Sequence, residues 1–149
     1  MKLTLLIIAL GLTMLSCAKD EEDTEEDTTK RDALTSGTWV LTGYLRDYAK
    51  DEVYEENTYL SFDICAKDNT YIFQIDGTWI ADEGLFKCYS DDPQVFTSSW
   101  SFSDDQTRIQ FGVQDYHIEE LTATTLRVRG KESWNVIYTI NVEKTFTKQ

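Results

Sequence analysis

The chain has 149 residues, and the segment 33–149 is large enough for one domain with a single hydrophobic core but small for two. Its 27 acidic side chains outnumber 14 Lys and Arg, so the formal net charge at pH 7 is −13. Because an acidic protein is repelled by nucleic-acid phosphates and anionic lipid head groups, this composition disfavours nucleic-acid binding.

Residues 1–16 have the pattern of a secretory signal. Lys2 supplies a positive charge, and residues 3–15 carry no charge and only two threonines. A membrane-spanning helix needs about 20 apolar residues, so this run is too short to be one. We interpret residues 1–16 as a signal peptide that is removed on export. The alternative, a buried N-terminal helix, conflicts with the acidic sequence that follows.

Cys17 ends a motif that resembles the lipobox of bacterial lipoproteins. Met14-Leu15-Ser16 precede it, with Met14 at the place where those proteins usually carry Leu. The resemblance implies cleavage before Cys17 and a diacylglycerol on its thiol, with fatty acids such as palmitate. Two or three acyl chains anchor a protein stably to a membrane.

We expect residues 17–32 to form a lipidated, disordered tether. Residues 19–32 contain eight acids, three bases and no apolar side chain, so they cannot bury surface. Residues 19–23 resemble the surface-export signal of Bacteroidetes lipoproteins, which implies the outer face of the outer membrane. The alternative is an outer-membrane lipoprotein that faces the periplasm.

Apolar side chains recur at every second position through residues 33–149, which predicts half-buried antiparallel strands. The positions expected on the inner face are Trp39, Leu41, Leu45, Leu60, Phe62, Ile64, Tyr71, Phe73, Ile75, Ile80, Trp100, Phe102, Ile109, Phe111, Val113, Tyr116, Ile118, Leu126, Val128, Val136, Tyr138, Ile140 and Val142. About eight strands joined as successive hairpins predict an all-β fold, a small up-and-down barrel. Closure of such a barrel removes exposed sheet edges.

The strongest turn signal is Asp76-Gly77, which lies between two alternating runs. A two-residue turn there would pair Phe73 with Ile80 and point Trp79 outward. Asp104-Asp105 predicts a second two-residue connection.

Cys65 and Cys88 are expected to form a disulfide. Lipidation uses Cys17, the odd cysteine of three, and paired thiols are oxidised in exported proteins. An unbroken hairpin ladder around Asp76-Gly77 would place the two residues opposite each other. The alternative is two free buried thiols. No Cys or His spacing suggests a metal site.

Several motifs carry a resemblance to a known family. Gly37-Thr38-Trp39 is similar to the Gly-x-Trp signature of lipocalins, in which the Trp plugs the base of the barrel. Further motifs follow in order and resemble the lipocalin-like domain of Bacteroidetes lipoproteins across residues 35–146: Cys65-Ala66-Lys67-Asp68, Asp76-Gly77-Thr78, Lys87-Cys88, Trp100-Ser101-Phe102 and residues 116–126. The chain is shorter than true lipocalins and lacks their long C-terminal helical segment.

The sequence offers little catalytic chemistry. His117 is the only histidine, and strand parity turns it outward beside Glu119. No nucleophile elbow, paired-histidine motif or phosphate-binding loop occurs, so we expect no enzyme activity and no cofactor or metal.

The candidate ligand-binding residues are the aromatic side chains of the predicted barrel interior, because an eight-stranded barrel can either be filled or hold one small ligand. They are Trp39, Tyr71, Phe73, Trp100, Phe102, Phe111, Tyr116 and Tyr138. Trp134 is placed at the rim. A barrel with a cavity would bind a small apolar or amphipathic molecule at the cell envelope. The alternative is a filled barrel that acts as a rigid module for binding another envelope protein.

Overall fold

The computed structural model describes residues 22–54, 56–133 and 138–149. The predicted signal peptide, Cys17, Trp134 and Val136 lie outside the described residues. Within the described residues, no helix is both long enough and apolar enough to cross a membrane.

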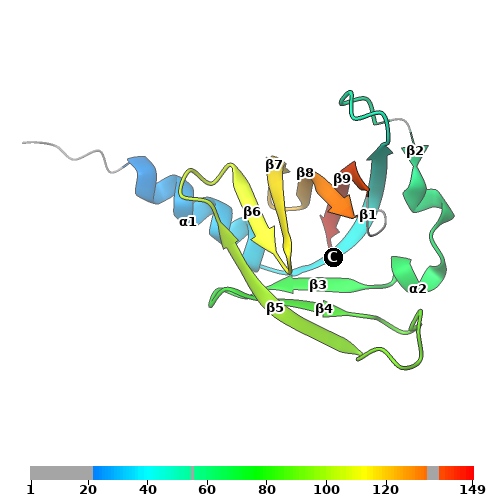
Figure 1. Ribbon diagram of the computed structural model, residues 1–149. Helices are drawn as coiled ribbons and strands as arrows, with labels where there is room; N and C mark the ends of the chain where they lie inside the picture. Colours follow the sequence, from blue (N-terminus) through cyan, green and yellow to red (C-terminus); the bar gives the residue numbers. More distant parts are fainter. Residues whose placement is uncertain (1–21, 55, 134–137) are drawn as a thin grey trace, which may run out of the picture.

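The fold is a closed antiparallel barrel of eight strands with one additional short strand (Figure 1). Each barrel strand pairs with the next along the chain, and β1 pairs with β9 to close the sheet. The barrel strands are β1 (Thr38–Asp47), β3 (Thr70–Phe73), β4 (Thr78–Asp82), β5 (Val95–Phe102), β6 (Arg108–Phe111), β7 (Gln114–Leu121), β8 (Thr125–Ser133) and β9 (Thr139–Lys148). The extra strand, β2 (Glu56–Asn57), pairs with the end of β1. The prediction of a small all-β up-and-down barrel is confirmed.

The core consists of the inward positions of the alternating strands. Trp39, Phe73, Tyr116 and Val128 are almost fully buried, together with the other core side chains Leu34, Leu41, Tyr44, Trp100, Ile109, Phe111, Leu126, Ile140, Val142 and Phe146. In β1 a bulge between Leu41 and Gly43 shifts the alternation by one residue. Tyr44 therefore points inward, where the sequence predicted Leu45.

The acid-rich segment differs from the expected disordered tether, because Glu22–Thr35 forms helix α1. Figure 1 shows α1 and the β2–α2 region on opposite sides of the barrel. The C-terminal turn of α1 is fixed by Leu34, which is fully buried, and by the Trp39 indole N–H, which donates to the Leu34 carbonyl at 2.8 Å. Glu is a good helix former, so a packed C-terminal turn can extend into the acidic sequence.

The turn at Asp76-Gly77 is longer than predicted. Phe73 pairs with Trp79 and not with Ile80, and Gly77 adopts φ +89° at the end of a three-residue loop. A three-residue loop that ends in a positive-φ glycine is a common alternative to the two-residue turn. The shift of one residue reverses the β4 faces, so Trp79 packs against the core while Ile75 is 63% exposed in the loop.

The connection after β5 is also longer than predicted, although the facing of the strands is preserved. Phe102 pairs with Ile109, so residues 103–107 connect β5 to β6. The Asp105 carboxylate accepts hydrogen bonds from Ser103 Oγ at 2.6 Å and from the Thr107 backbone N–H at 3.2 Å. These hydrogen bonds lower the pKa of Asp105 to about 2. The loop is two residues longer than predicted. Because side chains alternate with a period of two, the same residues still face inward.

The strand predicted around residues 60–64 is wrong. This stretch forms a 3-10 helix, η1 (Thr58–Ser61), and a short helix, α2 (Ile64–Lys67). Phe62 packs against the core, whereas Leu60 and Ile64 are exposed. Val113, predicted to point inward, is exposed in the tight β6–β7 turn. Apolar residues at every second position therefore also occur in segments that do not join the sheet.

Candidate ligand-binding site

A pocket of about 430 Å³ opens at one end of the barrel. Its wall includes Tyr71 at the start of β3, Phe96 near the start of β5 and Ser133 at the end of β8. Because neighbouring strands run antiparallel, the starts of β3 and β5 and the end of β8 point to the same end of the barrel. The full lining consists of Leu41, Tyr71, Trp79, Phe96, Phe111, Gly112, Val113, Gln114, Tyr116, Glu132, Ser133, Lys144 and Phe146.

Six of the thirteen lining residues are aromatic. Trp79 stacks on Tyr71 with ring centroids 6.1 Å apart, and it meets Phe96 edge-on at 6.0 Å and Phe111 at 5.6 Å. Phe111 in turn stacks on Tyr116 at 4.9 Å. Because each ring is held by neighbouring rings, the wall is preformed and does not need a ligand to organise it.

The end of the barrel next to α1 is packed. The indole N–H of Trp100 donates to the Gln74 carbonyl at 2.8 Å, and the Arg31 guanidinium lies 5.1 Å from the Trp100 ring centre. The Lys148 ammonium covers the Trp39 ring at 4.7 Å and donates to the Ala33 carbonyl at 2.6 Å. The end of α1 therefore closes the base of the barrel.

One polar cluster lies among the rings of the pocket. The Glu132 carboxylate accepts a hydrogen bond from the Tyr44 hydroxyl at 2.7 Å and another from the Tyr116 hydroxyl at 2.5 Å. The Lys144 ammonium pairs with the same carboxylate at 2.5 Å. It also lies 5.3 Å and 5.6 Å from the ring centres of Tyr44 and Tyr116. A buried charge pair of this kind is tolerable because both charges have several partners.

The electrostatics of the cluster keep Glu132 ionised and the phenols protonated. Burial acts to raise the pKa of Glu132, but Lys144 and the two tyrosine hydroxyls outweigh it and hold the pKa below its usual range. Burial, reinforced by Glu132, raises the pKa of both Tyr44 and Tyr116. The phenols therefore remain hydrogen-bond donors to the carboxylate at neutral pH.

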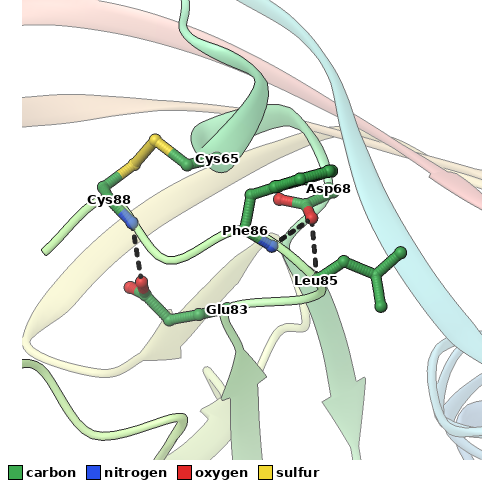
Figure 2. The surroundings of a disulfide bond; sticks show 6 residues. All are labelled: Cys65, Asp68, Glu83, Leu85, Phe86 and Cys88. Atoms are coloured by element: carbon green, nitrogen blue, oxygen red, sulfur yellow. Dashed lines mark hydrogen bonds between the residues drawn. A yellow bond between two sulfur atoms is a disulfide. The ribbon is translucent and has the colours of Figure 1, made fainter. Parts of the chain in front are cut away.

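A disulfide ties down the loops beside the pocket mouth. Cys65 of α2 is bonded to Cys88, which lies between β4 and β5, with Cα atoms 5.1 Å apart (Figure 2). The predicted pairing is confirmed, but its ladder argument is wrong because neither cysteine belongs to a strand. The Asp68 carboxylate accepts hydrogen bonds from the backbone N–H groups of Leu85 and Phe86 at 2.8 and 2.9 Å.

The structure brings together most of the aromatic residues predicted for the interior. Tyr71, Phe111 and Tyr116 line the pocket, whereas Trp39, Phe73, Trp100 and Phe102 belong to the packed core below it. The assignment of Tyr138 is wrong. It is 64% exposed, because β9 begins only at Thr139 and Tyr138 lies beyond the paired strands.

The sequence analysis missed Trp79, Glu132 and Lys144. Trp79 was expected to point outward because the β3–β4 turn is one residue longer than predicted. Glu132 and Lys144 continue the inward alternation of β8 and β9, respectively. Two neighbouring strands that carry residues of opposite charge at inward positions are the signal that could have revealed the cluster.

A second depression of about 950 Å³ lies on the outer face of β6–β8, against the loop after β1. Its charges are largely paired within the protein, as in Arg108–Asp115 at 2.8 Å and Arg129–Glu143 at 2.7 Å. His117 faces this groove, and its Nδ1 lies 3.3 Å from Glu119. The prediction that His117 points outward beside Glu119 is confirmed.

Known proteins give no further assignment: no family model matches the chain, and no curated protein is similar to it. Among residues 22–54, 56–133 and 138–149, no group of three or more His, Cys, Asp or Glu side chains could hold a metal ion.

Proposed function

We propose that this protein is a lipid-anchored, lipocalin-like protein of the bacterial outer membrane that binds a small apolar or amphipathic molecule in its barrel. The pocket of about 430 Å³ is the observation that carries this proposal. Its volume falls in the usual range of small-molecule sites, and its wall combines rings with a few polar groups, as such sites do.

The anchor part of the proposal is supported by the lipobox-like sequence that ends at Cys17. α1 begins five residues after Cys17 and runs into the closed base of the barrel. A lipid on Cys17 would therefore attach the barrel by its closed end, while the pocket opens at the other end. Such an orientation leaves the pocket accessible from the side away from the membrane.

The proposal is tested by titrating the protein with 1-aminoanthracene, a fluorophore that brightens in apolar surroundings. Phe96 lines the mouth and is 53% exposed, so Phe96→Ala removes pocket wall without opening the core. We expect about tenfold weaker binding, which corresponds to roughly 1.4 kcal/mol of lost contact. Phe86, 51% exposed outside the pocket, provides the matched control Phe86→Ala, which should bind normally. Absence of saturable binding to the unaltered protein would overturn the proposal.

A second candidate function, a module that binds another envelope protein, has one observation in its favour. Leu85, Phe86 and Tyr89 are exposed on the disulfide-linked loop, with Leu60 and Ile64 exposed on the segment that the disulfide joins to it. Exposed apolar patches often mark protein interfaces. Under this alternative, Phe86→Ala would abolish crosslinking to a membrane partner and Phe96→Ala would not.

A further inference from the structure

The first part of β5 forms an open edge of the sheet. β5 pairs with β4 along residues 95–99, but it pairs with β6 only through residues 100–102. The reason is that β6 ends at Phe111 and β7 already begins at Gln114. Figure 1 shows β5 continuing beside β4 beyond the end of β6. Among the described strands, residues 95–98 therefore have a neighbour on one side only.

The hydrogen bonds of β5 show which backbone groups face the open edge. The Trp100 N–H donates to the turn before β4 at 2.7 Å, whereas the Ser99 carbonyl accepts from the turn after β6 at 3.3 Å. Because successive residues of a strand point their N–H and C=O groups to opposite sides, Val95 and Thr97 face the β6 side, as Ser99 does. Within the described part of the chain, the backbone N–H and C=O groups of Val95 and Thr97 have no hydrogen-bond partner.

This edge lacks the features that usually prevent strand pairing. Natural proteins protect open edges with charged residues, proline or a bulge. Residues 95–98 have neither charge nor proline, and their pairing with β4 shows no register shift. The nearest proline, Pro93, precedes the strand. Val95 is 45% exposed and Phe96 is 53% exposed. An open, uncharged and partly apolar edge of this kind is suited to receive another strand.

The open edge borders the pocket of about 430 Å³. Phe96 of β5 lines this pocket, as do Gly112 and Val113 of the β6–β7 turn. A strand added to β5 would continue the line of β6, and every second side chain would point to the face of the sheet on which Phe96 lies. Free main-chain groups beside a pocket for alternate side chains are the features by which proteins recognise an extended peptide.

The charges beside the edge indicate which kind of segment would bind. Asp82, Glu83 and Asp92 line a smaller hollow of about 250 Å³, which Phe96 also lines. None of the described residues that line this hollow is positively charged. The whole chain carries a formal net charge of −13. Because complementary charges favour association, a basic segment suits this edge better than a second copy of the same acidic chain does.

We propose that the open edge of β5 binds an extended peptide segment of a partner protein, with apolar side chains at alternate positions and basic residues beside them. The segment hydrogen-bonds to the backbone of Val95 and Thr97, and one of its apolar side chains enters the pocket. Its basic residues lie towards Asp82 and Asp92. This inference goes beyond the binding of a small molecule, although both ligands use the same pocket.

The first test uses a short synthetic peptide in which leucine and threonine alternate between terminal lysines, with a fluorescent label for anisotropy. Two derivatives carry N-methyl groups, one on the leucine amides and the other on the threonine amides. In an added strand, only one of these two sets of amides faces β5. We expect one derivative to bind at least about tenfold more weakly and the other to bind within about twofold of the parent peptide. Equal binding of the two derivatives, or no binding of the parent peptide, would overturn the inference.

Thr97→Pro tests the edge from the side of the protein. Proline removes the N–H that faces the open edge, and because the Thr97 N–H points away from β4, no ladder hydrogen bond is lost. We expect the parent peptide to bind about five- to tenfold more weakly. The matched control Thr97→Ala keeps the N–H and should bind within about twofold of the unaltered protein. Unchanged binding by Thr97→Pro would contradict the inference. If Thr97→Pro does not fold, the methylated peptides still decide the question on the unaltered protein.

The charge and the pocket are tested with the same peptide. Glutamates in place of its terminal lysines should weaken binding about fivefold at low salt, and this difference should shrink at high salt. The parent peptide should also displace 1-aminoanthracene. Binding of the dye without binding of the peptide would overturn the inference and leave the proposed function standing. Binding of the peptide without binding of the dye would overturn only the proposed function.

Sedimentation of the unaltered protein tests the competing occupant, a second copy of the chain. We expect a monomer. A dimer that Thr97→Pro dissociates would assign the open edge to self-association and overturn the inference.

Discussion

Glu132 and Lys144 show how a single pair of residues can shape the interior of a barrel. Both side chains lie among rings, with only 17% and 19% of their surfaces exposed. The pair persists because Tyr44 and Tyr116 supply further hydrogen bonds to the carboxylate. Replacing such a pair by apolar residues of similar volume is often neutral or stabilising, whereas removing one partner alone is costly.

The first prediction concerns Lys144→Met. This change leaves the Glu132 carboxylate buried without its counter-charge, so the free energy of unfolding in urea should fall by roughly 3–5 kcal/mol. Adding Glu132→Gln to the same chain should restore most of the loss. If the double variant were no more stable than Lys144→Met alone, the pair would not be coupled in the way described.

The second prediction concerns pH. The folded-state pKa of Glu132 lies below its usual 4.5, so its contribution to stability is complete above that value. As pH falls through the folded pKa, protonation removes the contribution. The free energy of unfolding should therefore drop more steeply below pH 4.5 in the unaltered protein than in the double variant Glu132→Gln with Lys144→Met. Parallel pH profiles for the two proteins would refute this assignment.

At the scale of elements, α1 and the disulfide-linked loops define the two ends of the barrel. The end of α1 fills the base through Leu34, while Cys65–Cys88 holds the loops beside the mouth. Alternation predicted strands that form the barrel, but it did not predict the lengths of two turns. At Asp76-Gly77 a loop longer by one residue reversed the faces of β4, whereas at Asp104-Asp105 a loop longer by two residues preserved them. Local turn preferences do not distinguish these lengths.

The third prediction tests the packing of α1 against the base of the barrel. Leu34→Ala deletes a fully buried side chain at the base and should lower the free energy of unfolding by about 2–4 kcal/mol. Leu85→Ala, at a position that is 90% exposed, is the matched control and should change it by less than about 0.5 kcal/mol. Equal effects of the two substitutions would show that α1 does not pack as described.

The fourth prediction tests the disulfide. Replacing Cys65 and Cys88 together by Ser opens a loop that spans 23 residues, which should cost about 3 kcal/mol of unfolding free energy in the chain-entropy model. Because the linked loops lie outside the aromatic wall, the affinity for 1-aminoanthracene should change less than the stability does. Loss of binding in a variant that remains folded would place the loops within the site.

At the scale of the whole molecule, one end of the barrel is closed and the other holds a pocket. The closed end packs against α1, so a lipid on Cys17 would join the barrel through that end. The sequence could predict the barrel and most of the aromatic interior, because alternation reports which side chains face inward. It could not predict whether the interior is filled, because a cavity depends on how side chains from eight strands pack together.

The fifth prediction concerns the anchor. In cells that process lipoproteins, Cys17→Ser should abolish incorporation of labelled palmitate and release the protein from the membrane fraction. Cys88→Ser, which also removes a thiol, should retain the label. Persistence of the label in Cys17→Ser would disprove lipidation at that residue.

Binding of a small apolar or amphipathic molecule within the barrel mouth can be tested by photo-crosslinking. The protein is labelled with a twelve-carbon acylglycerol that carries a diazirine, and the modified residues are located by mass spectrometry. We expect saturable labelling of pocket residues such as Phe96, Val113 and Phe146, with competition by unlabelled monolaurin. Labelling confined to the exposed loop residues Leu85, Phe86 and Tyr89, without competition, would contradict it.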